Sequence, residues 1–346
     1  MKSFIFETMI INENYNLRSL NTFGINVDAK YFVEVASVEQ IDEAIAFAKA
    51  RNVPILLLGG GSNILFTEDF KGLVIKVGLK GIELISQDDR YYYVKVGAGE
   101  PWDDFVQYCV DHRYAGIENL SLVHGTVGAA PIQNIGAYGV EMKDHFHQLE
   151  FYFFESKTLK IFDKQACKFG YRDSIFKREL KGKGMVVSVT FQLLKVPEFN
   201  VKYGDIIEEI NRIGYNPISL KAIRVAISNI RNKKLPDPNF IPNAGSFFKN
   251  PVVSAAKHDQ LKKEFPGMVS FALINGNFKL AAAWLIDQCG WKGKSDGDAG
   301  VHDKQALVIV NHGNATGRDI YDLSEKIKIS VALKFGVELE REVNVV

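Results

Sequence analysis

The sequence predicts an α+β protein with at least two domains, and three observations support this. The chain has 346 residues, which is too long for one ordinary domain. Strand-like and helix-like patterns alternate in the first third, and helical periodicity dominates after about residue 203. A loop with three prolines, Leu235–Gly245, marks a possible domain boundary.

Composition narrows the class of protein. Hydrophobic residues make up 47% of the chain and charged residues 24%, as in soluble globular proteins with a sizeable core. The formal net charge of +1 argues against a dedicated nucleic-acid binder, although it is compatible with a local cationic pocket for an anionic small molecule. No stretch approaches roughly 18 uninterrupted apolar residues, so we expect no membrane partner.

The cysteines and the N-terminal residues indicate a cytoplasmic protein. Cys109, Cys167 and Cys289 are far apart and form no CxxC pair, which predicts reduced thiols. Glu7 and Asn12 interrupt any apolar run near the start of the chain, so we expect no signal peptide.

Two helices and six strands are expected in the first half of the chain. Ser37 is expected to cap a helix, with Gln40 completing a capping box, because apolar residues recur on one face after it. Pro101 suits the first turn of a second helix. Runs of apolar and β-branched residues predict strands at Tyr31–Ala36, Pro54–Leu58, Ile64–Phe66, Leu73–Val77, Tyr91–Val96 and Leu149–Phe154.

The second half becomes helical after one more long strand. Glu118–Val140, which precedes it, is rich in Gly, Ala and Asn with few charges, and we expect it to pack against something such as a ligand. The periodicity predicts strands at Val186–Leu194 and Ala306–Val310, a strand-like end at Gly336–Val346, and helices at Ser219–Asn232, Lys279–Cys289 and Thr316–Phe335.

A glycine-rich turn directly follows a predicted buried strand. It comprises Gly59, Gly60, Gly61, Ser62 and Asn63. Glycines let backbone N–H groups approach a phosphate closely, so phosphate binding is one interpretation, and a tight turn between strands is the other. The Rossmann fingerprint fails here, because its third glycine would fall on Ile64 and a strand follows instead of a helix.

Two further segments could carry chemistry. Small residues around Ser246 in Asn243–Asn250 expose a hydroxyl that could donate a proton, although serines of this kind are more often caps or turn residues. In Phe169–Lys177, Arg172 could point into an anionic site or could simply pair with Asp173.

Other patterns carry less information. Gly290–Ser295 is a near-miss of a phosphate-binding loop, since Gln288 stands where glycine is required, and Gly290 is better read as a helix C-cap. His145 and His147 lack flanking ligands at metal-binding spacing, so no metal site is expected.

Taken together, the segments resemble the UDP-N-acetylenolpyruvoylglucosamine reductase family over nearly the whole chain. The YGD sequence at Tyr203–Asp205 resembles the type I branch, whose tyrosine-bearing loop closes over substrate. Arg341 departs from the family pattern, because proline is common at that position. The matching segments are Asn21–Gly24, Leu57–Leu65, Gly116–Leu120, Pro131–Gly139, Gly170–Lys177, Lys234–Pro238, Asn243–Pro251 and Leu339–Val343.

The resemblance implies a domain plan. Residues 20–197 are expected to form a two-subdomain FAD-binding domain of the PCMH/vanillyl-alcohol-oxidase type, split near residue 80. Residues 198–232 would form a helical connection that carries the substrate loop. Residues 233–334 would form an α+β substrate-binding domain, and 335–346 a strand that returns to the active site.

The resemblance also implies ligands and site residues. FAD, held non-covalently, would receive a hydride from NADPH and pass it to C3 of enolpyruvyl-UDP-N-acetylglucosamine in peptidoglycan synthesis. Ser246 would protonate C2, and Arg172 and Glu342 would flank the carboxylate. Expected FAD contacts are Gly59, Gly60, Gly61, Ser62, Asn63, Gly125, Ile132, Asn134, Ile135 and Gly136, and expected substrate contacts are Tyr171, Tyr203, Arg231, Lys234 and Asn250.

Two alternatives stay open at this point. An FAD oxidase of a sugar or alcohol could share the glycine turn, and His124 could then attach the flavin covalently. A non-catalytic UDP-sugar sensor would not need Arg172, Ser246 and Glu342 together. We expect a bacterial, cytoplasmic enzyme that acts as a monomer.

Overall fold

The computed structural model describes residues 9–346, and the first eight residues, on which part of the signal-peptide prediction rests, lie outside the described residues. The chain divides into two compact units that each combine separate stretches of sequence. The first unit comprises the chain up to Tyr15, Asp28–Gly60 and Phe70–Arg231. The second unit comprises Asn16–Val27, Gly61–Asp69 and Asn232–Val346.

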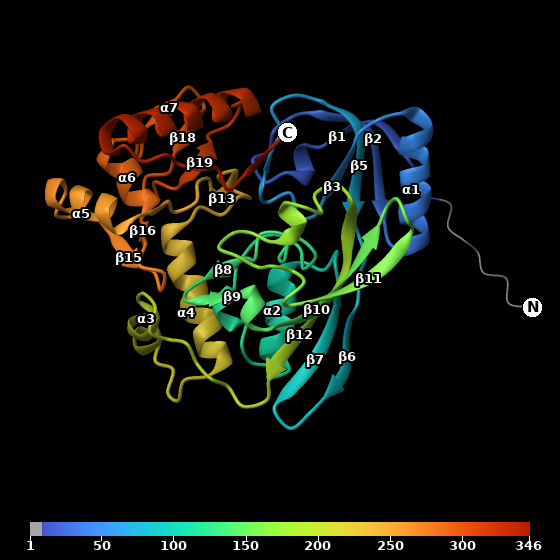
Figure 1. The fold of residues 1–346 in the computed structure, drawn as a ribbon, viewed down its shortest axis with the longest axis horizontal. Coiled ribbons are helices and arrows are strands. Elements are labelled where there is room, and N and C mark those ends of the chain that lie inside the picture. Colours follow the sequence, from blue (N-terminus) through green and yellow to red (C-terminus); the bar gives the residue numbers. More distant parts are fainter. Residues whose placement is uncertain (1–8) are drawn as a thin grey trace, which may run out of the picture. The chain divides into compact units, whose positions relative to one another are not determined.

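A four-stranded sheet opens the first unit, with α1 packed along it (Figure 1). β5 pairs in parallel with β2 on one side and with β3 on the other. Ser37 caps α1 as expected, but Gln40 bonds the backbone N–H of Ala36 rather than that of Ser37, so the box closes one residue earlier. The bounds are β1 Asn12–Asn16, β2 Asp28–Val35, α1 Val38–Arg51, β3 Ile55–Leu58 and β5 Phe70–Val77.

A second, antiparallel sheet in the same unit has five strands in the order β11-β10-β12-β7-β6. Trp102 and Phe105 of α2 pack on Phe191 of β12 in the core. Pro101 is the N-cap of α2 rather than its first residue. The bounds are β6 Ile82–Gln87, β7 Tyr91–Gly97, α2 Trp102–Asp111, β10 Phe146–Phe153, β11 Thr158–Asp163 and β12 Gly184–Leu194.

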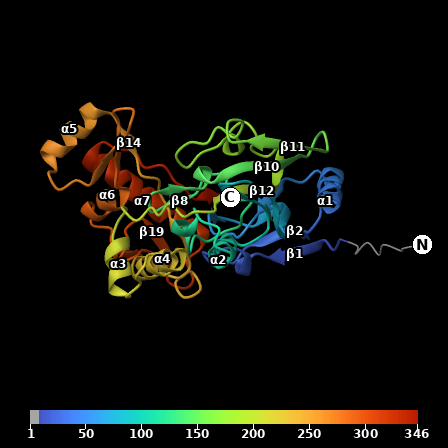
Figure 2. The same cartoon turned by 90° about the horizontal axis from the view of Figure 1, so that it is seen from below.

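Short elements complete the first unit. The stretch Glu118–Val140, expected to be irregular, forms mostly turns and contains the 3-10 helix η2 at Glu118–Leu120. Helices α3 (Ile206–Arg212) and α4 (Leu220–Lys234) lie side by side (Figure 2), because their isoleucines share one apolar cluster. The other short elements are β8 Gly136–Ala137, β9 Val140–Glu141, η3 Met142–Asp144 and η4 Ile175–Lys177.

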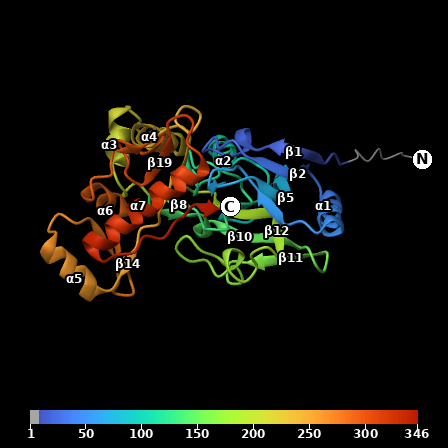
Figure 3. The same cartoon turned by 90° about the horizontal axis from the view of Figure 1, so that it is seen from above.

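The second unit contains three small sheets and three α-helices. Helix α7 contacts α6, β18 and β19 (Figure 3). The sheet orders are β13-β19-β18-β17 and β14-β16-β15, and β4 pairs in parallel with β20. The bounds are η1 Arg18–Leu20, β4 Ile64–Leu65, β13 Asn243–Ser246, β14 Val252–Val253, α5 Ala255–Glu264, β15 Ser270–Ala272, β16 Phe278–Leu280, α6 Ala282–Gln288, β17 Ser295–Asp296, β18 Ala299–Val301, β19 Val308–Asn311, α7 Gly317–Phe335 and β20 Asn344–Val345.

Two expected elements need correction. The helix predicted at Lys279–Cys289 starts only at Ala282, because Lys279 pairs across strands with Val252 and Phe271. The strand-like end is regular only at Asn344–Val345. Gly290 follows α6 with a φ of +77°, as a helix-terminating glycine should. Every helix within residues 9–346 is too short or too polar to cross a bilayer.

Candidate active site

The first half of the glycine turn is packed closely against Gly125 and Thr126. A Cβ atom on Gly60 would lie 2.8 Å from the Cα of Gly125, and one on Gly59 would lie 2.7 Å from Oγ1 of Thr126. The Lys76 ammonium donates a 2.7 Å hydrogen bond to the Gly59 carbonyl. Burial lowers the pKa of Lys76, and the charge of Glu34 opposes that shift. The turn is therefore a side-chain-free cradle with a cation beside it, which suits the diphosphate of FAD.

The second half of the turn lies in the second unit and joins the segment of Glu342. Gly61 has a φ of +65°, and a Cβ atom there would lie 1.9 Å from the Leu20 carbonyl oxygen. The side-chain amide of Asn63 donates to the backbone carbonyl of Glu342 at 3.3 Å. The backbone N–H of Asn344 in turn donates to the Asn63 carbonyl at 3.1 Å. Asn63, an expected FAD-contact position, is thus bonded to an expected catalytic segment.

Asn134 is buried, and its side chain stabilises the segment that is expected to lie along the flavin. Its amide nitrogen donates to Glu141 at 3.1 Å and to the Gly170 carbonyl at 3.0 Å, and its oxygen accepts from the Lys143 N–H at 3.1 Å. Ile135 likewise donates its N–H to the Ala130 carbonyl at 3.1 Å. These bonds shape the loop, so contact with a cofactor would come from other atoms of these residues.

Arg172 is held by the same loop. Its φ is +53°, which L-residues rarely adopt, and its Nη2 donates to the Gly136 carbonyl at 2.7 Å. Its guanidinium carbon lies 5.7 Å from the ring centroid of Tyr171. The guanidinium of Arg172 is therefore bonded to the loop that contains Gly136, an expected FAD-contact position.

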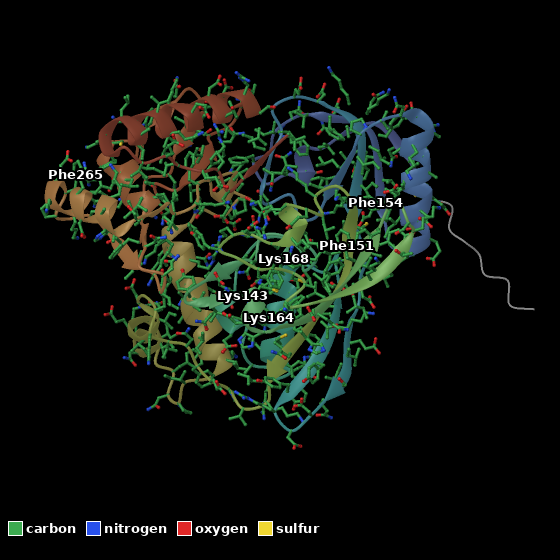
Figure 4. All side chains as sticks on the ribbon, viewed as in Figure 1. Lys143, Phe151, Phe154, Lys164, Lys168 and Phe265 are labelled. Atoms are coloured by element: carbon green, nitrogen blue, oxygen red, sulfur yellow. The ribbon has the colours of Figure 1, made fainter. Side chains whose placement is uncertain are left out.

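Buried neighbours anchor the Arg172 segment. Ser174 is fully buried and donates a 2.6 Å hydrogen bond to the Ile132 carbonyl. Phe176 stacks on Phe151 of β10, labelled in Figure 4, with ring centroids 5.1 Å apart. Asp173, the neighbour of Arg172, forms an ion pair with Arg178 at 3.2 Å.

Ser246 lies exposed at the end of β13, on a backbone fixed from both sides. Asn243 is buried, and its side-chain oxygen accepts the N–H of Gly245, which has a φ of +67°. The next residue, Phe247, accepts the backbone N–H of Glu342 at 2.9 Å. The structure thus brings the Ser246 and Glu342 segments together within the second unit.

Arg341, which departs from the family pattern, attaches the backbone next to Glu342 to α7. Its guanidinium donates to Ser324 at 2.9 Å and forms an ion pair with Glu325, both on α7. The hydrogen bond from Arg341 to Glu325 is the main reason why the pKa of Glu325 is lowered. Arg341 thereby ties the strand-like end of the chain to α7, directly before Glu342.

The expected substrate contacts occupy several elements. Arg231 lies on α4, where burial lowers its pKa while its hydrogen bond and charge interaction with Tyr138 oppose the shift. Asn250 accepts the Ala282 N–H at 2.9 Å and so caps α6. Lys234 is exposed as the last residue of α4, and Tyr203 is 48% exposed.

Across residues 9–346, no group of three or more His, Cys, Asp or Glu side chains is placed to hold a metal ion. His147 lies exposed on β10, and His145 ends the short helix η3. The cation that sequence reasoning missed is Lys76, whose signal is a lysine within the apolar strand Leu73–Val77.

The fold and the glycine cradle agree with comparisons to known proteins. Residues 29–161 match the family described as FAD binding domain. A reductase structure from Thermus caldophilus superposes with a TM-score of 0.67 at 24% identity, covering 97% of this chain and 99% of that one, which establishes a shared fold. The chain therefore contains an FAD-binding domain.

The comparisons also define the family. Residues 237–346 match the C-terminal domain of UDP-N-acetylenolpyruvoylglucosamine reductase. The reductase of that name from Amoebophilus asiaticus is 48% identical over 338 residues, covering 98% of this chain and all of its own length. The one from Flavobacterium johnsoniae is 44% identical over 339 residues, again 98% of this chain. The chain belongs to the UDP-N-acetylenolpyruvoylglucosamine reductase family.

Proposed function

We propose that this protein reduces enolpyruvyl-UDP-N-acetylglucosamine to UDP-N-acetylmuramate with NADPH, a step of bacterial peptidoglycan synthesis. One observation supports this most strongly: the Glu342 N–H bonds the Phe247 carbonyl, which sets the expected acid Ser246 beside Glu342. The names of relatives up to 48% identical agree with this activity. The three free cysteines support a cytoplasmic location.

FAD fits the residues of the glycine turn. When bound, FAD supplies the hydride chemistry, taking a hydride from NADPH and delivering it to the enolpyruvyl C3 atom. Gly59, Gly60 and Gly125 would hold the diphosphate, since any Cβ on the first two meets a neighbour closer than 3 Å. Lys76 would add a positive charge there. The remaining proposed FAD contacts are Gly61, Ser62, Asn63, Ile132, Asn134, Ile135 and Gly136.

Arg172 binds the carboxylate of the enolpyruvyl group in this proposal. A guanidinium presents a planar fork of donors that matches a carboxylate. Because one nitrogen is already held by the Gly136 carbonyl, the group is oriented before substrate arrives. An oriented donor aimed at developing negative charge contributes about 10²–10³ in rate.

Ser246 delivers the proton to C2, and Glu342 acts beside it. The Ser246 hydroxyl is exposed on a fixed backbone, so its position matters more than its acidity. Glu342 must itself hold a proton if it is to stabilise an enolate-like anion. The UDP-sugar would contact Tyr171, Tyr203, Arg231, Lys234 and Asn250.

The test is NADPH oxidation by the purified protein, with and without enolpyruvyl-UDP-N-acetylglucosamine. We expect substrate-dependent oxidation and a product two hydrogens heavier by mass spectrometry. An oxidase of sugars would instead consume O₂ with a sugar or alcohol and form peroxide. A sensor would bind the UDP-sugar without turnover, and either result would overturn the proposal.

A further inference from the structure

One buried asparagine joins two segments that are far apart in the sequence. Asn119 is 1% exposed, and its amide nitrogen donates to the Tyr138 carbonyl at 2.9 Å and to the Asn200 carbonyl at 2.8 Å. Both donor hydrogens of the amide are thus used on backbone oxygens. The first partner belongs to the turn between β8 and β9, and the second to the segment that leads to Tyr203.

Asn119 stands on a rigid base. The carbonyl of Leu120 accepts from the buried Trp102 indole at 3.0 Å. The N–H of Leu122 donates to Asp103 at 2.6 Å, and Arg224 of α4 holds both oxygens of Asp103 at 2.7 and 2.8 Å. Helix η2 is therefore bonded to α2, which is bonded to α4, and Asn119 has little freedom to move.

The Tyr203 segment has further contacts with the same turn. The side chain of Asn200 donates to the Gly139 carbonyl at 3.0 Å. The rings of Tyr138 and Tyr203 meet edge to face at 6.2 Å. A Cβ atom on Gly139 would lie 3.4 Å from the Cβ of Tyr203, so glycine permits this close approach.

The turn itself needs such support. Tyr138 has a φ of +50° and Gly139 a φ of +80°, and a bulky residue in the left-handed region costs free energy. Asn119 and Asn200 bond the carbonyls of these two residues. The same bonds that stabilise the strained turn therefore fasten the Tyr203 segment to it.

We propose that Asn119 is a positioning residue for substrate binding, because its amide fastens the segment that carries Tyr203 onto the Tyr138–Gly139 turn. Asn200 adds a second fastening. The inference rests on the proposed function, in which Tyr203 contacts the UDP-sugar. Fastening raises the fraction of molecules in which Tyr203 is already in place, and apparent affinity scales with that fraction.

The decisive variants are Asn119→Asp and Asn200→Ala. Aspartate matches asparagine in shape but cannot donate, so both bonds of Asn119 are lost. Two bonds of ordinary strength correspond to about a 10- to 100-fold change in an equilibrium. We expect the KM for enolpyruvyl-UDP-N-acetylglucosamine to rise by about that factor in Asn119→Asp and less in Asn200→Ala, with NADPH reduction of the flavin unchanged in stopped flow.

A second measurement needs no substrate. Lys202 is exposed within the fastened segment, so trypsin should cut there faster in both variants than in the wild type, as followed by mass spectrometry. Asn211→Asp, an exposed charge change on α3, is the control and should leave the cleavage rate and the KM unchanged. The variants could be cleaved faster while the wild type does not turn over enolpyruvyl-UDP-N-acetylglucosamine. That result would contradict the proposed function but not the fastening of the Tyr203 segment by Asn119.

Wild-type cleavage at Lys202 in Asn119→Asp would overturn the inference. An equal loss of both half-reactions would overturn it as well, because it would mean that Asn119 supports the whole fold rather than this segment. If Asn119→Asp does not fold, Asn200→Ala decides alone, since Asn200 is only partly buried.

Discussion

At the scale of single residues, Ser246 allows proton transfer to be separated from hydride transfer. Ser246→Ala should keep its FAD and be reduced by NADPH at the wild-type rate, because the hydroxyl is exposed and supports no buried contact. Reoxidation by enolpyruvyl-UDP-N-acetylglucosamine should slow by about 10²–10⁴, the usual contribution of general acid catalysis. Stopped-flow spectroscopy at the flavin absorbance measures both steps.

The cysteine variant is the matched control. Ser246→Cys should recover part of the reoxidation rate, since a thiol can also donate a proton from nearly the same place. If Ser246→Ala slows both half-reactions equally, or neither, Ser246 is a turn residue only.

Lys234 tests substrate capture at the same scale. The side chain is exposed at the end of α4, so Lys234→Ala should not disturb the fold. We expect a higher KM for the UDP-sugar, because a cation that pairs with the diphosphate is lost, and little change in reduction of the flavin by NADPH. Equal damage to both half-reactions would instead indicate a site shared with the nicotinamide nucleotide. Steady-state kinetics with each substrate varied in turn distinguishes these results.

At the scale of elements, the glycine turn couples backbone packing to the cofactor. Gly60→Ala would put a methyl group 2.8 Å from the Cα atom of Gly125. Because the neighbouring atoms of Gly125 are backbone atoms, the loop must shift to make room. We expect flavin content after purification to fall sharply. Gly267→Ala is the control, since a Cβ there meets nothing within 4 Å and the residue has no positive φ.

The thermal midpoint of the cofactor-free proteins completes this test. A Gly60→Ala protein that folds in its FAD-free form but binds no FAD supports the cradle. A Gly60→Ala protein with full flavin content contradicts it.

Sequence patterns predicted the long elements and missed the short ones for a physical reason. Periodicity needs several residues, and it located α1, α7 and β12 well. Strands such as β14 and β17 have two residues each and are defined by their partners rather than by their own composition. The same limit applies to the candidate site residues. Arg172 and Ser246 could be singled out because they stand in recognisable sequence segments. Lys76 and Asn119 could not, because their importance comes from contacts with residues distant in the sequence.

At the scale of the whole molecule, the units are not continuous in sequence. Thr67 donates its backbone N–H to the carbonyl of Val346 at 2.8 Å, and Asn243 donates to that of Thr22 at 2.9 Å. Such bonds place Asn16–Val27 and Gly61–Asp69 in the second unit. Consecutive residue ranges cannot describe units of this kind. The composition of a segment does not indicate which distant segment it pairs with.

The whole-molecule prediction concerns FAD itself. We expect yellow protein with one FAD per chain, held without a covalent bond, because the cradle is formed by Gly59 and Gly60, which offer no side chain for attachment. Acid or heat precipitation should release the flavin into the supernatant. Re-addition should raise the thermal midpoint with FAD concentration, since a ligand bound only by the folded state stabilises it by about 2.7 kcal/mol at 100 times its Kd. Flavin that stays in the acid pellet would show covalent attachment, with His124 as the first residue to test, and colourless protein that cannot be reconstituted would contradict the flavoprotein assignment.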